Sequence, residues 1–182
     1  MAISPDTKDW TWVLERPCVE CGFDSRAVDR EHIAAILRDN ASAWVGVLAA
    51  GDSETLTVRP SEERWSRLEY GCHVRDVFRR FDERLDLMLD TENPSFANWD
   101  QDATAVSGRY DEQDPALVAI ELLEAGNGLA GRFAAVTDHE WERVGTRSDG
   151  ARFSVETLGR YLLHDIVHHL TDIGARAPAA GA

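Results

Sequence analysis

The sequence contains few cysteines and no long apolar run. No window approaches the ~18 uninterrupted apolar residues of a membrane-spanning helix, and residues 1–12 contain no apolar signal core. The three cysteines, Cys18, Cys21 and Cys72, are too few for a disulfide scaffold and odd in number, which is typical of a reducing compartment. These absences predict a cytoplasmic protein that does not bind a membrane.

Positive charge is also scarce, and lysine occurs only at Lys8. The formal net charge is -14 over 182 residues, and the acidic residues are dispersed through the chain rather than gathered in a tail. This distribution argues against a surface that binds nucleic acid or an anionic membrane. With 43% hydrophobic residues and no repeat of fixed period, the chain is expected to form one domain around one core.

Four segments carry the 3.6-residue apolar period of an amphipathic helix. A side chain that can cap a helix begins each of them, and Pro115 follows the cap of the third. The expected helices span residues 24 or 25 to 51, 66–90, 114–136 and 154–174.

Glycine is unusually frequent inside the third expected helix, at Gly126, Gly128 and Gly131. Each glycine costs a helix ~1 kcal/mol relative to alanine. We therefore expect either close packing against another helix or a local bend to compensate for these residues.

The connections between the helices are long at first and short at the end. Residues 52–68 lose the apolar period and contain Pro60, so we expect an extended crossover there. Residues 91–113 form a second long connection, and residues 141–153 indicate a short β-hairpin before the last helix. The sequence therefore predicts an all-α fold, a four-helix bundle with long crossover connections and a small hairpin.

The two ends of the chain do not share the helical pattern. Residues 1–23 are expected to form an extended arm laid over the body and anchored by Trp10, Trp12 and Phe23. Residues 24–174 form the expected bundle, and residues 175–182 have little that could pack and are expected to be disordered.

The last expected helix carries histidine and aspartate within its apolar pattern. Asp165 and His169 lie four residues apart on the core-facing side, and His164 and His168, also four apart, lie on a neighbouring side. Residues at i and i+4 of a helix are ~5 to 6 Å apart at Cβ, so either pair could supply two ligands to one metal ion. His73 points toward the core from the second expected helix.

The expected arm contains the motif Cys18-Val-Glu-Cys21-Gly, which resembles half of a zinc knuckle or a redox centre. A structural zinc site needs four ligands and no second such motif exists, whereas a thioredoxin-type centre needs a βαβ unit that this chain lacks. If the motif binds a metal, the remaining ligands must come from His32, Cys72 or a second subunit. We favour the simpler interpretation of two ordinary thiols in a turn, with Cys72 as a packing residue.

The second and fourth expected helices contain the motifs Trp65-Ser66-x-x-Glu69-x-x-x-His73-Val74-x-Asp76 and Asp165-x-x-His168-His169-x-x-Asp172-Ile173. Together these motifs resemble the DinB superfamily, which includes bacillithiol transferase-like proteins and mycothiol-dependent maleylpyruvate isomerases. The resemblance covers residues 24–173 and leaves residues 1–23 unexplained. It implies a four-helix bundle that binds one divalent metal ion, and a homodimer.

The resemblance also implies a set of metal ligands, namely His73, Asp165 and His169. Most members of the family have histidine where this chain has Asp165, but a carboxylate can complete a zinc site. An alternative register uses His73 with His164 and His168. We favour the first set, because the family spacing and the core-facing side of the helix agree on it.

Further residues could orient these ligands. Asp76 and Asp172 each follow a predicted ligand by one helical turn and could accept an imidazole N–H, and His168 is a third candidate. The simpler interpretation is an exposed carboxylate for each aspartate and a surface or partly buried imidazole for His168 and for His164.

Three protein ligands leave open positions on the metal, as in catalytic zinc sites. A zinc or nickel ion there would lower the pKa of a bound thiol or water. The resemblance implies transfer of a small-molecule thiol of the mycothiol or bacillithiol type to an electrophile, or thiol-assisted isomerisation. The alternative is a non-catalytic metal-binding protein of the stress response.

Overall fold

The computed structural model describes residues 10–175 and confirms the expected four-helix bundle. Its long helices are α1 (Ile33–Ala50), α3 (Arg67–Asp90), α5 (Pro115–Ala135) and α6 (Val155–Asp172). Helix α1 packs along α5 and α6, and α3 packs along the same two helices from the other side. Disorder was predicted for residues 175–182. This was wrong for Ala175, which packs against the core and donates its N–H to the carbonyl of Leu170 at 2.9 Å, and residues 176–182 lie outside the described residues.

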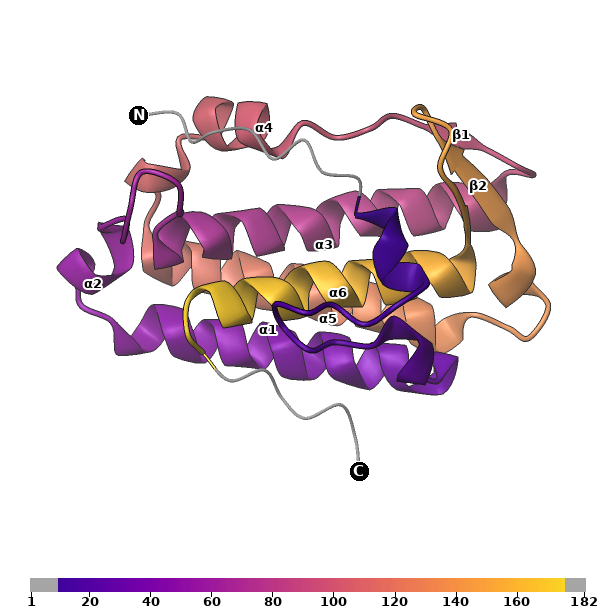
Figure 1. Cartoon of the computed structure of the whole chain (residues 1–182), viewed down its shortest axis with the longest axis horizontal. Helices are drawn as coiled ribbons and strands as arrows, with labels where there is room; N and C mark the ends of the chain where they lie inside the picture. The colour runs from indigo at the N-terminus through magenta and orange to yellow at the C-terminus, as the bar shows by residue number, and fades with distance from the viewer. Residues whose placement is uncertain (1–9, 176–182) are drawn as a thin grey trace.

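The direction of the helices follows from the lengths of the connections. The segment between α3 and α5 runs back along the whole bundle, so these two neighbours begin at the same end and are parallel (Figure 1). Helices α1 and α6 run in the opposite direction. Because α3 and α6 are antiparallel, the first turns of α3 lie beside the last turns of α6.

Local caps explain why three of the helix starts were predicted within one residue. Ser66 and Ser154 each form a capping box, in which the serine side chain accepts a hydrogen bond from the third helical residue and that residue's side chain accepts one from the serine N–H. Asp114 accepts a hydrogen bond from the N–H of Ala116, with Pro115 in the first turn of α5. These caps set the positions of α3 and α6, which carry the candidate ligands.

The predicted start of the first helix was wrong. Asp24 caps a 3-10 turn, η2 (Ser25–Ala27), a second turn, η3 (Arg30–His32), follows, and α1 begins only at Ile33. Between the turns the backbone of Val28 is extended, its side chain is buried, and its carbonyl accepts a hydrogen bond from Arg160 of α6 at 3.0 Å. This contact across the bundle interrupts the helix, and no local pattern predicts it.

The first connection was predicted to be extended, but it contains a short helix, α2 (Ser53–Thr57). Asp52 caps α2 by accepting a hydrogen bond from the N–H of Thr55 at 2.8 Å. Leu56 is buried with Leu48 and Leu68, which explains why the segment folds back onto the bundle instead of crossing it as an extended strand.

The second connection also contains ordered elements, namely β1 (Ser95–Phe96), α4 (Gln101–Ser107) and the 3-10 turn η4 (Tyr110–Glu112). The predicted hairpin is present as β2 (Val144–Arg147) and β3 (Arg152–Ser154), preceded by the 3-10 turn η5 (Glu140–Glu142). Strand β1 pairs with β2 in parallel, so the hairpin is part of a three-stranded sheet at one end of the bundle.

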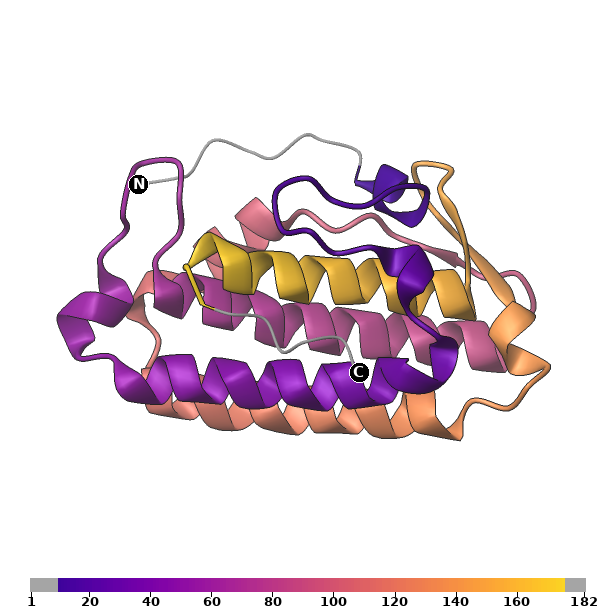
Figure 2. The same cartoon turned by 60° about the horizontal axis from the view of Figure 1, so that its bottom comes forward.

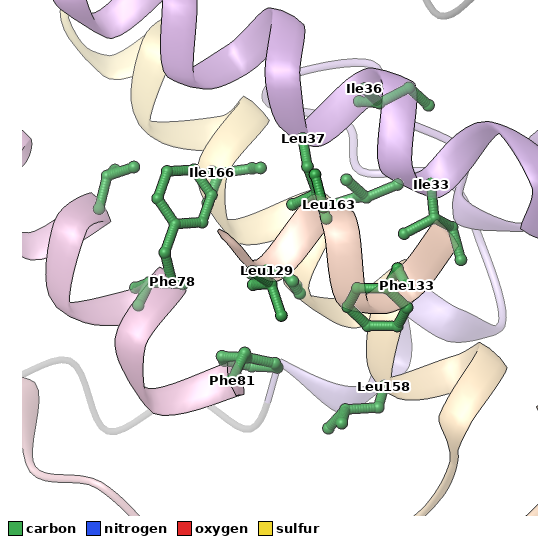
Figure 3. Packing of buried hydrophobic residues seen from close by; sticks show 14 of the residues in the cluster. Ile33, Ile36, Leu37, Phe78, Phe81, Leu129, Phe133, Leu158, Leu163 and Ile166 are labelled. Atoms are coloured by element: carbon green, nitrogen blue, oxygen red, sulfur yellow. The ribbon is translucent and has the colours of Figure 1, made fainter. Parts of the chain in front are cut away.

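The core fills the centre of the bundle with aliphatic and aromatic side chains from all four long helices (Figure 3). By length and composition alone, the segment Arg30–Ala50 could cross a membrane. In the fold, Ile33, Leu37 and Trp44 of this segment are fully buried among the other helices, which is the pattern of a core helix.

Residues 1–9 of the predicted arm lie outside the described residues. Residues 10–23 were predicted to be extended, but they contain a 3-10 turn, η1 (Thr11–Leu14), and they lie over α6 (Figures 1 and 2). The rings of Trp10, Trp12 and Phe23 all lie within 6.5 Å of the imidazole of His164, measured between centroids. The arm is therefore packed against the helix that carries the candidate metal ligands.

The three glycines of α5 have different surroundings. A Cβ atom added to Gly126 would lie 2.7 Å from the Cβ of Ala41 and 3.0 Å from the ring of Phe78, so this glycine permits close packing of α5 against α1 and α3. Gly128 and Gly131 have open space at the same position. Close packing therefore explains only Gly126.

We expect Gly126→Ala to lower the free energy of unfolding by ~1 to 2 kcal/mol, because the overpacking outweighs the gain in helix propensity. Gly128→Ala is the matched control and is expected to raise it by ~0.5 to 1 kcal/mol. Denaturant unfolding of both variants measures the difference. Equal effects of the two substitutions would contradict the close packing at Gly126.

Candidate metal centre

His73 lies in the second turn of α3 and its side chain is fully buried. Its Nε2 atom lies 3.4 Å from Oδ1 of Asp165 on α6. The ring of Trp99 is stacked on the imidazole at a centroid distance of 5.3 Å, and the ring of Trp65 lies 5.2 Å away. Aromatic side chains thus hold His73 in place and exclude water from it.

Asp165 and His169 complete a cluster with His73 at the end of the bundle where α3 begins. Nε2 of His169 lies 3.2 Å from the same Oδ1 atom of Asp165, one helical turn earlier. One ligand atom from each of the three residues lies within 4.8 Å of the others. The antiparallel arrangement of α3 and α6 therefore brings together three residues that are up to 96 positions apart in the sequence.

The donor set fits a divalent metal ion. Nitrogen and oxygen ligands at ~2.0 to 2.2 Å from a tetrahedral ion are ~3.3 to 3.6 Å apart. The 3.4 Å distance from His73 to Asp165 lies within this range, and the 3.2 Å distance from His169 lies just below it. Nδ1 of His169 donates a hydrogen bond to Oδ2 of Asp172 at 2.9 Å, which leaves Nε2 as the ligating atom. In the described part of the chain, Nδ1 of His73 is buried without a hydrogen-bond partner.

Without a metal, these groups shift one another's pKa. Burial lowers the pKa of His73. Burial would raise the pKa of Asp165, but hydrogen bonds from His169 and His73 outweigh it and the pKa is lowered. Burial would lower the pKa of His169, but hydrogen bonds to Asp165 and Asp172 outweigh it and raise the pKa to about 9. A metal ion must therefore displace a proton from His169 at neutral pH.

The candidate centre is accessible from one side. The side chains of Asp165 and His169 are 25% and 17% exposed, whereas His73 is fully buried. A cavity of about 400 Å³ is lined by Trp65, which contacts His73, and by Asp172, which contacts His169, whereas the three candidate ligands are not among its lining residues. Its other lining residues include Thr55, Val58, Pro60, Arg64, Arg67 and Ile173.

The two aspartates that were candidates for orienting the ligands behave differently. Asp172 accepts the Nδ1–H of His169, as described above. Asp76 does not contact His73, because its carboxylate accepts hydrogen bonds from Arg75 at 2.8 Å and from the hydroxyl of Tyr110 at 2.5 Å. The expectation for Asp76 was therefore wrong: it pairs with an arginine and a tyrosine instead.

The alternative register required His164 and His168 to lie beside His73. In the structure they belong to a different cluster. Both histidines are buried and lie within 4.8 Å of the thiols of Cys18 and Cys21, measured between ligand atoms. The simpler interpretation of these histidines as surface or partly buried imidazoles does not describe this environment.

The other ligands suggested for the cysteine motif are elsewhere. The side chain of His32 is 61% exposed and lies near Asp29, and the thiol of Cys72 is buried and points to the carbonyl of Tyr110 at 3.8 Å. Sequence reasoning missed the true neighbours of Cys18 and Cys21, because it could not show which helix the arm covers. The i, i+4 spacing of the two histidines was the available signal.

Comparisons with known proteins agree with this fold. The model of the DinB superfamily matches residues 36–173, which include all three residues of the candidate centre. A search of curated proteins finds no match. Among solved structures, the chain is similar to YfiT from Bacillus subtilis, with a TM-score of 0.71 and 18% sequence identity over 80% of this chain and 85% of that chain. YfiT is described as a probable metal-dependent hydrolase with an unusual four-helix bundle topology.

Proposed function

Since the chain belongs to the DinB superfamily, we propose that it is a metal-dependent enzyme whose divalent ion, zinc or nickel, is bound by His73, Asp165 and His169. The observation that carries this proposal is the convergence of these three residues from two helices, with ligand-atom distances of 3.2 and 3.4 Å to one carboxylate oxygen. Three protein ligands are the pattern of a catalytic site, because a fourth position remains for a substrate or water.

The ion would supply one chemical property, a lowered pKa of a bound thiol or water, so that a nucleophile forms near neutral pH. The protein supplies the rest. Asp172 accepts the Nδ1–H of His169 and so holds this imidazole in the tautomer that presents Nε2. Asp165 provides a negative charge next to the ion, and the rings of Trp65 and Trp99 keep water away from His73.

We propose a small-molecule thiol as the nucleophile and an electrophile as its acceptor, in either a transfer or an isomerisation reaction. The cavity of about 400 Å³ is large enough for part of such a substrate. Arg64 and Arg67 line this cavity and would favour a substrate with negative charge on the side that faces them.

A second candidate is a hydrolase, in which water replaces the thiol. The fold similarity to YfiT, which is described as a probable metal-dependent hydrolase, favours this reaction class. The two candidates share the same ligands and differ only in the nucleophile, so an assay with and without thiol separates them.

We expect the metal-loaded protein to consume an electrophile, such as monobromobimane, in the presence of mycothiol, bacillithiol or glutathione. Turnover should stop when the metal is chelated and return when zinc or nickel is added, because the thiol then ionises near neutral pH. A parallel assay with ester and amide substrates and no thiol tests the hydrolase. Absence of metal-dependent turnover in both assays would contradict the proposal and favour a non-catalytic metal-binding protein.

A further inference from the structure

A second cluster of metal-ligating side chains lies between the arm and α6. Cys18 and Cys21 come from the arm, and His164 and His168 come from consecutive turns of α6. One ligand atom from each of the four residues lies within 4.8 Å of the others. Cys18 and Cys21 are free thiols.

The distances in this cluster fit a tetrahedral ion. Sγ of Cys18 lies 3.7 Å from Nδ1 of His168. Sulfur at ~2.3 Å and nitrogen at ~2.0 to 2.1 Å from a tetrahedral zinc ion are ~3.6 Å apart. Two thiolates and two imidazoles in tetrahedral geometry are the ligands that select zinc.

The orientation of His168 supports a role as a ligand. While Nδ1 faces Cys18, Nε2 lies 3.5 Å from the carboxylate of Glu20 and 3.6 Å from that of Asp172. A carboxylate on the far nitrogen is the usual arrangement around metal-bound histidine, because it fixes the tautomer. Glu20 stands between the two cysteines in the sequence, so the same turn would supply two ligands and one orienting carboxylate.

His164 has a nitrogen atom that lacks a partner. Among residues 10–175, its buried Nε2 atom makes no hydrogen bond. Cys18 is only 1% exposed and His164 only 4%, and the ring of Trp10 lies 5.5 Å from that of His164 and 5.3 Å from that of His168. Buried polar side chains without partners are costly, so this cluster lacks a group that would satisfy it.

The turn that contains the cysteines has a fixed shape. The N–H of Cys18 donates to the carbonyl of Phe23 at 2.9 Å, and the N–H of Gly22 donates to the carbonyl of Cys18 at 2.8 Å. Gly22 has a φ of 75°, a conformation that other residues rarely adopt. Two backbone hydrogen bonds within residues 18–23 therefore close the turn that carries the two thiols.

We propose that Cys18, Cys21, His164 and His168 bind a structural zinc ion that fastens the arm to α6. Four protein ligands close the coordination sphere, in contrast to the three-ligand candidate centre on the same helix. Asp172 links the two sites, because Oδ2 accepts the hydrogen bond from His169 while Oδ1 lies 3.6 Å from His168. The proposal does not depend on the proposed function.

Elemental analysis of the purified full chain tests this site. Wild-type protein loaded with zinc is expected to hold two ions per chain, Cys21→Ser one, and His169→Ala one. Cys72→Ser is the matched control, because Cys72 is a buried thiol outside both clusters, and it is expected to retain both ions. If only the candidate catalytic centre fails, wild type will hold one ion that is lost in Cys21→Ser and retained in His169→Ala.

A measurement on wild-type protein removes the dependence on variants that could misfold. A mercurial reagent that modifies thiols should release one zinc ion per chain, detected with a chromogenic chelator. Cobalt-substituted wild type should show thiolate-to-cobalt charge transfer that survives in His169→Ala. No thiol-dependent release of zinc and no charge-transfer band would overturn the structural zinc site.

Discussion

Replacing His169 by alanine is expected to weaken metal binding at the candidate catalytic centre by roughly 100- to 1000-fold. Four-ligand zinc sites are worth about 10 to 16 kcal/mol at pH 7, so one ligand accounts for about 3 to 4 kcal/mol. His169 makes the shortest contact to Asp165 in the cluster and is the histidine that Asp172 orients. Competition with a chelating dye, after the cysteine cluster has been saturated, measures the loss.

The control for this variant is His139→Ala, because His139 is an exposed histidine whose Nδ1 lies 3.3 Å from the hydroxyl of Thr137 within a surface turn. It should leave the affinity unchanged. Asp172→Asn retains all three ligands but weakens the acceptor for His169, so a smaller loss of about 10- to 100-fold is expected. Unchanged affinity in His169→Ala would contradict the assignment of His169 as a ligand of this centre.

Helix positions could be predicted from the sequence where local chemistry decides them. Ser66, Asp114 and Ser154 cap their helices through hydrogen bonds to residues two or three positions later, so a short window of sequence contains the whole interaction. Asp24 can cap a helix in the same way as Asp114, but in the structure it caps the 3-10 turn η2 instead of an α-helix. The extended backbone at Val28 is held by Arg160, which is 132 positions away, and no local window contains that contact.

In the candidate site, too, local relationships could be predicted from the sequence and long-range contacts could not. Asp165 and His169 could be paired from sequence because both lie on one helix, and His73 joined them through the resemblance to the DinB superfamily. Cys18 and His168 are 150 positions apart, and their contact depends on which side of the bundle the arm covers. That choice depends on tertiary packing, in which the rings of the arm contact α6.

The two histidine-bearing pairs of α6 were treated as competing ligands for one ion. In the structure they face different partners, since one pair meets α3 and the other meets the arm. The chemistry of each pair matches its neighbours: Asp165 and His169 meet a single histidine and stay partly exposed, whereas His164 and His168 meet two thiols and are buried. One helix can therefore serve an open site and a closed site, because successive residues face different sides.

Replacing Glu69, the residue that closes the capping box of α3, is expected to have a large effect on the stability of the protein. Glu69 is only 2% exposed, and its carboxylate accepts hydrogen bonds from the N–H of Ser66 and from Nε of Arg59, both at 2.8 Å. It lies one turn before His73, so it fixes the end of the helix that positions this ligand. Removal of the carboxylate leaves the guanidinium of Arg59 without its main acceptor and opens the cap.

We expect Glu69→Ala to lower the free energy of unfolding by about 3 kcal/mol at pH 7, since it disrupts a largely buried ion pair and a cap together. The melting temperature should fall by roughly 6 to 12 °C. Glu62→Ala is the control, because Glu62 is exposed near the same helix start, and its effect should stay within about 0.5 kcal/mol. Equal losses in the two variants would contradict the role of Glu69.

The difference in the free energy of unfolding between wild type and Glu69→Ala should depend on pH, which provides an independent check. Burial would raise the pKa of Glu69, but hydrogen bonds from Arg59 and Ser66 outweigh it, and the pKa is lowered. A carboxyl group whose pKa is lower in the folded protein stabilises it above the unfolded pKa of ~4.3, and this contribution is lost as the pH falls toward the folded value. The deficit of Glu69→Ala should therefore be full at pH 7 and shrink below pH ~4. Denaturant unfolding across this range measures it, and a deficit that grows on acidification would show that the carboxylate is not held by Arg59.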